Sequence, residues 1–177
     1  MKHFTSTVYG NSFIHVAGNT FALAWADNSY DGNITTLTIS NDGATITEVA
    51  SLEHDTNHGL HASFEQLDSD TYVLAYSGNA YDGFIKTFTI AADGATITQV
   101  ASLEHDEFYG VWNSLVRSND NTFLLAYMGD GDDGYLKSFT IPDDGASITQ
   151  VTSIEHDPNH GSYNSCLLYT SPSPRDS

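Results

Sequence analysis

The sequence is poor in cysteine, in basic residues and in long apolar runs. One cysteine, Cys166, occurs in 177 residues, which excludes a disulfide framework and a cysteine-based zinc site. Only 5 lysines and arginines oppose 23 aspartates and glutamates, for a net charge of −18. This charge repels phosphate backbones and anionic bilayers, so we expect no nucleic-acid partner. No run approaches the ~18 apolar residues that cross a bilayer, so we expect no membrane insertion.

What the sequence does contain is a tandem repeat, together with enough apolar material, 40% of its residues, for a core. The pattern of residues 71–83 occurs 51 residues earlier at 20–32 (71 − 20) and 51 residues later at 122–134 (122 − 71). A Glu-His-Asp triplet and an Asp-Gly pair return with the same spacing. The whole unit is therefore repeated, and internal repetition of this length is typical of arrays of small supersecondary units.

Each unit divides into four short runs whose alternation and apolar content predict β-strands. In the second unit these runs are about 62–67, 71–77, 84–90 and 97–105, and turn residues separate them. Asp-Gly pairs at Asp42, Asp93 and Asp144 predict tight hairpins between the third and fourth strands. The second strand is apolar on both faces, so we expect it to be covered on both sides, with Leu23, Leu74 and Leu125 in the cores.

A four-stranded antiparallel meander repeated in tandem resembles the blade of a β-propeller. The resemblance covers residues 1–165 and implies an all-β, propeller-like arc of three four-stranded blades, a fragment of a larger propeller. The blades span approximately 10–58, 59–109 and 110–160. Residues 161–165 repeat 110–114 and begin a fourth blade, which disfavours a β-trefoil. The motif pairs of the WD40 and kelch subfamilies are missing, so no subfamily is indicated, and open blade edges predict self-association.

The repeat breaks off after Ser165. Residues 166–177 resemble a translated sequencing adapter, and we interpret them as a non-native tail on a fragment of metagenomic origin. The alternative is a genuine tail rich in proline and serine. If the tail is non-native, the only cysteine leaves with it, and the native part contains no thiol.

Strand parity predicts which loops share a face. When successive strands alternate in direction, the loop between the second and third strands opens on the same side as the connection to the next unit, and the Asp-Gly hairpins open on the other. The shared side gathers aromatic, imidazole and carboxylate groups. The candidates for a binding face are Tyr30, Asp31, His54, Asp55, Tyr81, Asp82, His105, Asp106, Tyr109, His156 and Asp157, and His58 and His160 lie in the same loops.

Two groups of side chains in these loops could take part in catalysis or bind a metal ion. A histidine beside a carboxylate is a common metal ligand or general base. Repetition in every unit favours a structural role instead, since a catalytic site is normally built once, and we assign no catalytic residue. Asp130, Asp132 and Asp133 form a glycine-rich acidic loop that is a candidate calcium site, with a solvated turn as the alternative. We expect no other cofactor.

We therefore expect a non-enzymatic binding, adhesion or structural scaffold, a fragment of a secreted or surface propeller that presents its repeated loops to a glycan or protein ligand. The acidic composition favours an extracellular or cell-surface location. The alternative is a fragment of a propeller enzyme, a polysaccharide hydrolase or lyase, with its catalytic residues elsewhere.

Overall fold

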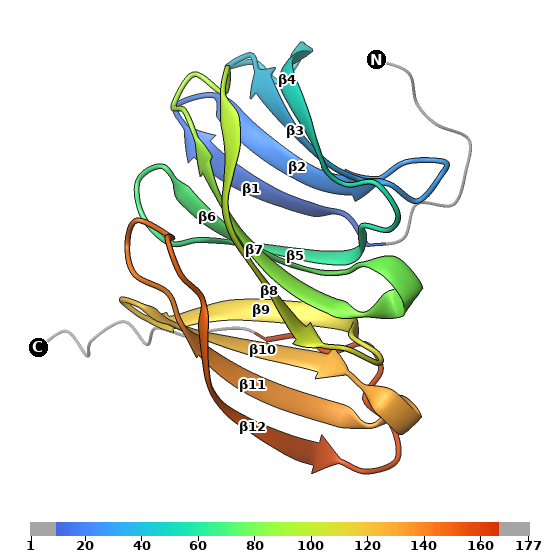
Figure 1. Ribbon diagram of the computed structural model, residues 1–177. Helices are drawn as coiled ribbons and strands as arrows, with labels where there is room; N and C mark the ends of the chain where they lie inside the picture. The colour runs from blue at the N-terminus through green and yellow to red at the C-terminus, as the bar shows by residue number, and fades with distance from the viewer. Residues whose placement is uncertain (1–9, 167–177) are drawn as a thin grey trace, which may run out of the picture.

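The computed structural model describes residues 10–166, which form three four-stranded antiparallel sheets arranged as an arc (Figure 1). Each sheet is one predicted blade, numbered here one to three, with strand order following the chain. Blade one contains β1 (Ser12–Ala17), β2 (Thr20–Ala26), β3 (Gly32–Ile39) and β4 (Ile46–Asp55). Blade two contains β5 (Leu60–Gln66), β6 (Thr71–Ser77), β7 (Gly83–Ile90) and β8 (Ile97–Asp106). Blade three contains β9 (Val111–Asn119), β10 (Thr122–Met128), β11 (Gly134–Thr140) and β12 (Thr149–Asp157).

The predicted strands are close to the observed ones. β6 has the predicted bounds, β5 begins two residues earlier than predicted, and β8 ends one residue later. Two short 3₁₀ turns, η1 (Asn79–Tyr81) and η2 (Asp130–Asp132), lie in the loops between the second and third strands of blades two and three. Within residues 10–166, no helix has the length and apolar character needed to cross a membrane.

The core consists of two layers, each between adjacent blades. Ala22, Ala24 and Ile34 of blade one pack with Tyr72, Leu74, Tyr76 and Phe88 of blade two. The other face of blade two packs through Val73, Ala75 and Ile85 with Phe123, Leu125, Tyr127 and Phe139 of blade three. Every residue of β6 is buried, as its apolar pattern on both faces predicts.

One core prediction is wrong. Leu74 and Leu125 are fully buried, but Leu23 is only half-buried. Leu23 points away from blade two on β2, where alternate residues are buried and half-buried. The corresponding face of β6 is covered by blade one, whereas no blade among the described residues covers this face of β2. Burial of this position therefore requires a neighbouring blade as well as an apolar strand.

Regular hydrogen bonds also join the first strands of successive blades. The backbone N–H of Phe64 donates to Oγ of Ser12 over 3.0 Å, and that of Leu115 to Ser63 over 2.9 Å. The N–H of Cys166 donates to Ser114 over 2.8 Å in the same way. The backbone thus continues the repeat through residue 166, while residues 167–177 of the predicted tail lie outside the described residues.

Candidate functional site

The two sets of loops predicted to share a face do so. The register pairs Gly32 with Asp55, Gly83 with Asp106 and Gly134 with Asp157, so each blade brings both loops to one end of its sheet. The loops are also hydrogen-bonded: the N–H of Gly59 donates to the carbonyl of Tyr30 over 2.9 Å, and that of Gly110 to Tyr81 over 2.8 Å. We call this end the loop face. It comprises residues 27–31, 55–59, 78–82, 106–110, 129–133 and 157–161.

Glycine is required where these two loops touch. A Cβ at Gly59 would lie 2.1 Å from Cα of Gly32, and one at Gly110 would lie 2.3 Å from Cα of Gly83. Distances below 3 Å do not occur between such atoms, so any side chain would push the loops apart. The glycines that begin the third strands, Gly32 and Gly83, are therefore required by packing against Gly59 and Gly110.

His54 and His105 are buried under the loop face and act as packing residues. Their rings make edge contacts with Tyr76 and Tyr127, at centroid distances of 4.7 and 4.9 Å. Burial, with a smaller contribution from the adjacent lysine, lowers the pKa of each histidine to about 3. Both rings are therefore neutral near pH 7, and neither nitrogen of His105 has a hydrogen-bond partner within the described part of the chain. This environment suits an apolar ring and not a general base.

The third histidine of the set has different surroundings. His156 is exposed, because no further blade covers this part of blade three within residues 10–166. Its ring still packs on the glycine of its own blade, since a Cβ on Gly134 would lie 2.6 Å from Cε1 of His156. The repeat therefore keeps the packing on glycine in every blade, and the burial depends on the neighbour.

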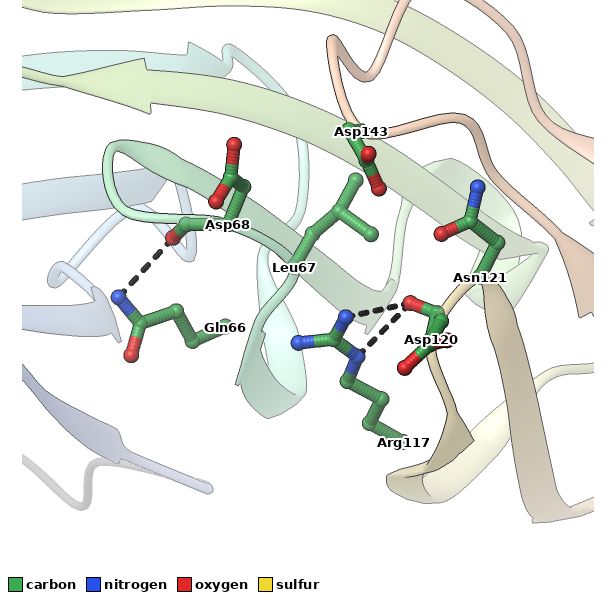
Figure 2. Close-up of a pocket in the computed structure, with 7 residues that line it drawn as sticks. All are labelled: Gln66, Leu67, Asp68, Arg117, Asp120, Asn121 and Asp143. Carbon is green, nitrogen blue, oxygen red and sulfur yellow. Dashed lines mark hydrogen bonds between the residues drawn. The ribbon is translucent and has the colours of Figure 1, made fainter.

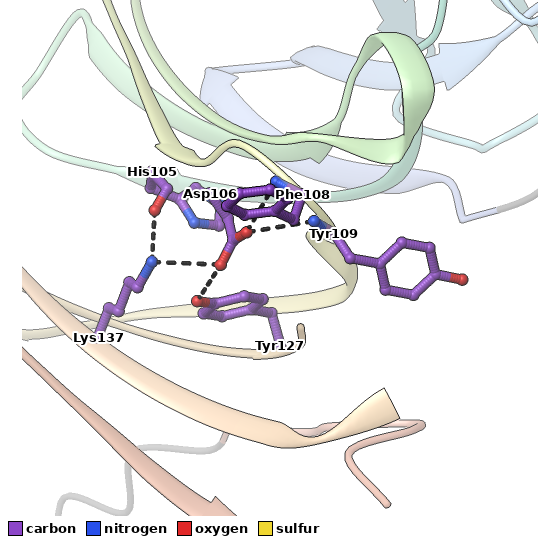
Figure 3. A network of polar contacts seen from close by, with 6 residues as sticks. All are labelled: His105, Asp106, Phe108, Tyr109, Tyr127 and Lys137. Atoms are coloured by element: carbon purple, nitrogen blue, oxygen red, sulfur yellow. Dashed lines mark hydrogen bonds and ion pairs between the residues drawn. The ribbon is translucent and has the colours of Figure 1, made fainter. Parts of the chain in front are cut away.

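The aspartate after each buried histidine joins two blades (Figure 3). Oδ1 of Asp106 accepts the N–H groups of Phe108 and Tyr109 at 3.1 and 3.2 Å, which closes the loop of blade two. Oδ2 accepts from the hydroxyl of Tyr127 of blade three at 2.8 Å and lies 3.5 Å from Nζ of Lys137. Lys137 also donates to the carbonyl of His105. Burial raises the pKa of Asp106, but these hydrogen bonds and the lysine outweigh it, and the pKa is lowered overall.

The same network joins blades one and two. Asp55 accepts from the hydroxyl of Tyr76 at 2.8 Å, and Nζ of Lys86 lies 4.0 Å from its Oδ2. In blade one the Tyr and Lys positions hold Trp25 and Thr35, which hydrogen-bond to each other over 2.9 Å. Asp55 and Asp106, two of the candidate binding residues, are thus engaged inside the structure. Their role is to hold adjacent blades in register.

Four aromatic side chains form a continuous row on the loop face. The ring centroids of Tyr30, His58, Tyr81 and Tyr109 follow one another at 5.8, 5.7 and 5.9 Å. Tyr30 and Tyr81 are 47% and 44% exposed, and both have a left-handed backbone, with φ of 72° and 71°. Asp31 and Asp82 directly follow these tyrosines and are half-buried beside the row. We call Tyr30, His58, Tyr81 and Tyr109 the aromatic row.

The three calcium candidates lie in and directly after η2, in the acidic loop of blade three. Asp130 and Asp132 are exposed and Asp133 is half-buried. Across residues 10–166, no three His, Cys, Asp or Glu side chains are grouped so that they could hold a metal ion. Asp157 accepts two amide hydrogen bonds, from Asn159 and His160 at 3.0 and 3.3 Å, as its counterparts do in their own loops.

Sequence reasoning missed a second group of rings on this side of the molecule. Trp112 lies between His61 and Tyr163, with ring centroids 4.5 Å away on both sides and the rings tilted by 45° and 38°. These three residues occupy one repeat position at the start of successive first strands, and blade one has Gly10 there. All four have positive φ. The glycine was the available signal, since a glycine in one unit of a repeat indicates that the position requires this conformation.

An open hollow lined mainly by polar and acidic residues lies at the end of the blades opposite the loop face (Figure 2). It measures about 590 Å³, and its lining includes Asp68, Asp120, Asp143 and a single cation, Arg117. Nε of Arg117 donates to the carbonyl of Asp120 over 2.9 Å, so the guanidinium is bound to its own turn. An open acidic hollow whose arginine is already engaged is a poor site for an anion.

Comparisons with known proteins identify the architecture. No family model matches the chain, and no curated protein matches its sequence. Among solved structures, Sqt1 of Saccharomyces cerevisiae is similar with a TM-score of 0.56 and 15% identity over 83% of this chain and 35% of that one. The fold is a β-propeller. Sqt1 of Chaetomium thermophilum gives a TM-score of 0.56 with 19% identity over 86% and 37% of the two chains.

A third propeller is similar to a lesser degree. The periplasmic gluconolactonase PpgL of Pseudomonas aeruginosa gives a TM-score of 0.51 and 12% identity over 79% of this chain and 55% of that one. The chain spans 35–55% of the length of these three structures. Likeness at such low identity concerns the fold alone, since one fold hosts many functions.

Proposed function

We propose that this propeller chain is a binding or adhesion scaffold whose loop face recognises a glycan or protein ligand. The observation that carries the proposal is the aromatic row, in which rings from four loops of two blades follow one another in one stacked and two tilted contacts. Tyrosine supplies a large contact area with little loss of side-chain freedom, which is why it is enriched at recognition surfaces. A half-exposed row of such rings suits an extended ligand that lies across two adjacent blades.

The loops that carry the aromatic row are held firmly by the structure beneath them, which favours a binding role over a conformational change. The glycine contacts and the bonds between aspartate and lysine hold each loop on its own sheet and on the next blade. A rigid platform loses little entropy when a ligand binds, so weak contacts along the row add to a useful affinity. The net charge of −18 favours neutral or cationic ligands over anionic ones. A secreted or cell-surface location suits this role and is part of the proposal.

The test measures binding of the full chain to immobilised neutral polysaccharides and to surface proteins of neighbouring cells. Tyr81→Ala removes the central tyrosine of the row and should weaken binding by roughly tenfold, in line with an aromatic anchor at an interface. Val100→Ala is the matched control, since Val100 is a similarly exposed apolar residue on β8 outside the row. Equal binding by both variants would show that the row is not the recognition surface. Release of sugar from a polysaccharide by the wild-type chain would support the enzyme alternative.

A further inference from the structure

The group of His61, Trp112 and Tyr163 lines a cavity of its own. The cavity measures about 240 Å³, and Ala62, Asn113 and Asn164 also line it, together with Gly10. Its lining residues fall at two adjacent repeat positions, which in blades two and three lie at the start of the first strand, whereas the aromatic row belongs to the loops between strands.

The backbone at this position is left-handed and lies in an irregular pairing at the start of the first strand in blades two and three. φ is 53° at His61, 56° at Trp112 and 58° at Tyr163. Left-handed backbone is uncommon for bulky side chains, and glycine, which blade one uses at Gly10, adopts it without cost. Blades two and three and the start of the fourth unit thus carry large aromatic residues at a position whose backbone conformation glycine adopts at lower energy. Strain of this kind gathers at ligand sites, where it orients side chains for binding.

The polar groups of the cavity are acceptors. The hydroxyl of Ser77 donates its hydrogen to the carbonyl of Gly110 over 2.6 Å. Nδ1 of His61 lies 3.1 Å from Oγ of Ser77, so Nδ1 carries the hydrogen of that second bond. Nε2 of His61 is then an acceptor. Oδ1 of Asn113 is buried and has no hydrogen-bond partner within residues 10–166, while its Nδ2 donates to the carbonyl of Gly110 over 3.0 Å. An unpaired acceptor of this kind calls for a donor from a ligand.

The cavity carries no formal charge. Burial lowers the pKa of His61 to about 4, so its ring is neutral near pH 7. The lining contains no Lys, Arg, Asp or Glu. Sites for phosphate, sulfate or carboxylate use cationic groups, and sites for metal ions use clustered anionic oxygens. The ligand that fits is therefore neutral, has donors at its edge and has a flat apolar face.

We propose that this cavity binds a single neutral sugar ring, such as the terminal pyranose of a glycan. The C–H face of the sugar lies against the phenol of Tyr163, which is 77% exposed, beside the edge of Trp112, and the hydroxyls donate to His61 and Asn113. The positive C–H edges of the sugar meet the negative faces of the rings. A few placed polar groups within an apolar lining are the usual composition of a small-molecule site.

The test uses fluorescence of Trp112 in the full chain. The chain has two tryptophans, so Trp25→Phe leaves Trp112 as the reporter. The probes are the methyl glycosides of glucose, galactose and mannose, with choline chloride and sodium glucuronate as cationic and anionic counterparts. At least one neutral glycoside should give a saturable change in emission, with a Kd on the order of 1 mM. Choline or glucuronate as the preferred probe, or no saturable response to any glycoside, would overturn the proposal.

Two variants copied from other units of the chain separate binding from folding. Trp112→Gly introduces the residue of blade one and should weaken glycoside binding, measured by calorimetry, roughly tenfold or more. Because it also relieves the strained backbone, the melting temperature should stay near the wild-type value. Asn113→Ala, which copies Ala62, should weaken binding several-fold. A large fall in melting temperature for Trp112→Gly, or unchanged glycoside binding in both variants, would assign the three rings a structural role.

Discussion

Asp106→Asn tests whether the network between blades two and three holds them together. The side chains of Lys137 and Asp106 are 10% and 16% exposed, so the pair is largely withdrawn from water. Asparagine retains an oxygen for the amides of Phe108 and Tyr109 and removes the charge opposite Lys137. Taking one partner from a buried ion pair costs about 3–5 kcal/mol. Lys137 keeps its bond to the carbonyl of His105, so we expect the lower end, about 3 kcal/mol.

The chain provides a matched control. Asp157 occupies the same repeat position and accepts the same two loop amides, but no Tyr and Lys from a following blade face it within residues 10–166. Asp157→Asn should therefore leave unfolding close to wild type. For a chain of this size, about 3 kcal/mol corresponds to a fall in melting temperature of roughly 6–12 °C, which calorimetry or denaturant titration resolves.

A double-mutant cycle identifies the partner. In a Lys137→Met background the buried charge is absent, so the added cost of Asp106→Asn should fall to about 1 kcal/mol, the value of an ordinary hydrogen bond. Equal effects of Asp106→Asn and Asp157→Asn, or costs that simply add in the cycle, would refute the assignment of this network to blade packing.

Other predictions concern the core, pH, the tail and calcium. Leu74→Ala should cost roughly 2–5 kcal/mol in denaturant unfolding, and Leu23→Ala distinctly less, because Leu23 lacks a covering blade; equal costs would contradict the packing described. The pKa of His54 and His105 is lowered to about 3, so between about pH 6.5 and 3 the unfolded chain binds more protons than the folded one. The free energy of unfolding should be highest above this pH range and should fall as the pH drops through it, by up to about 1.4 kcal/mol for each pH unit and each histidine. His105→Phe should make the free energy of unfolding depend less steeply on pH. Deleting residues 167–177 should leave the melting temperature unchanged, and a clear fall would show that the tail belongs to the fold. Calcium should not raise the melting temperature, and a rise that Asp132→Asn abolishes would establish a site in the acidic loop.

The number, order and direction of the strands could be read from the sequence because these are local properties. Alternation of side chains locates a strand such as β6, and the Asp-Gly pairs locate the hairpins. Strand parity alone places Asp31 and His54 at one end of the sheet, since each antiparallel reversal changes the end at which a loop opens. A repeat strengthens each of these inferences, because every unit tests the same pattern again.

The roles of the individual loop residues were decided by tertiary structure. His105 and His156 have the same local sequence, yet one is a buried neutral ring and the other is exposed, because burial comes from the following blade. Tyr30 and Tyr109, far apart in the chain, belong to one row only because two loops of each blade meet at their glycines. Local sequence determines strand and turn, whereas desolvation and ring contacts depend on which blade lies alongside, and that is a property of the assembled propeller.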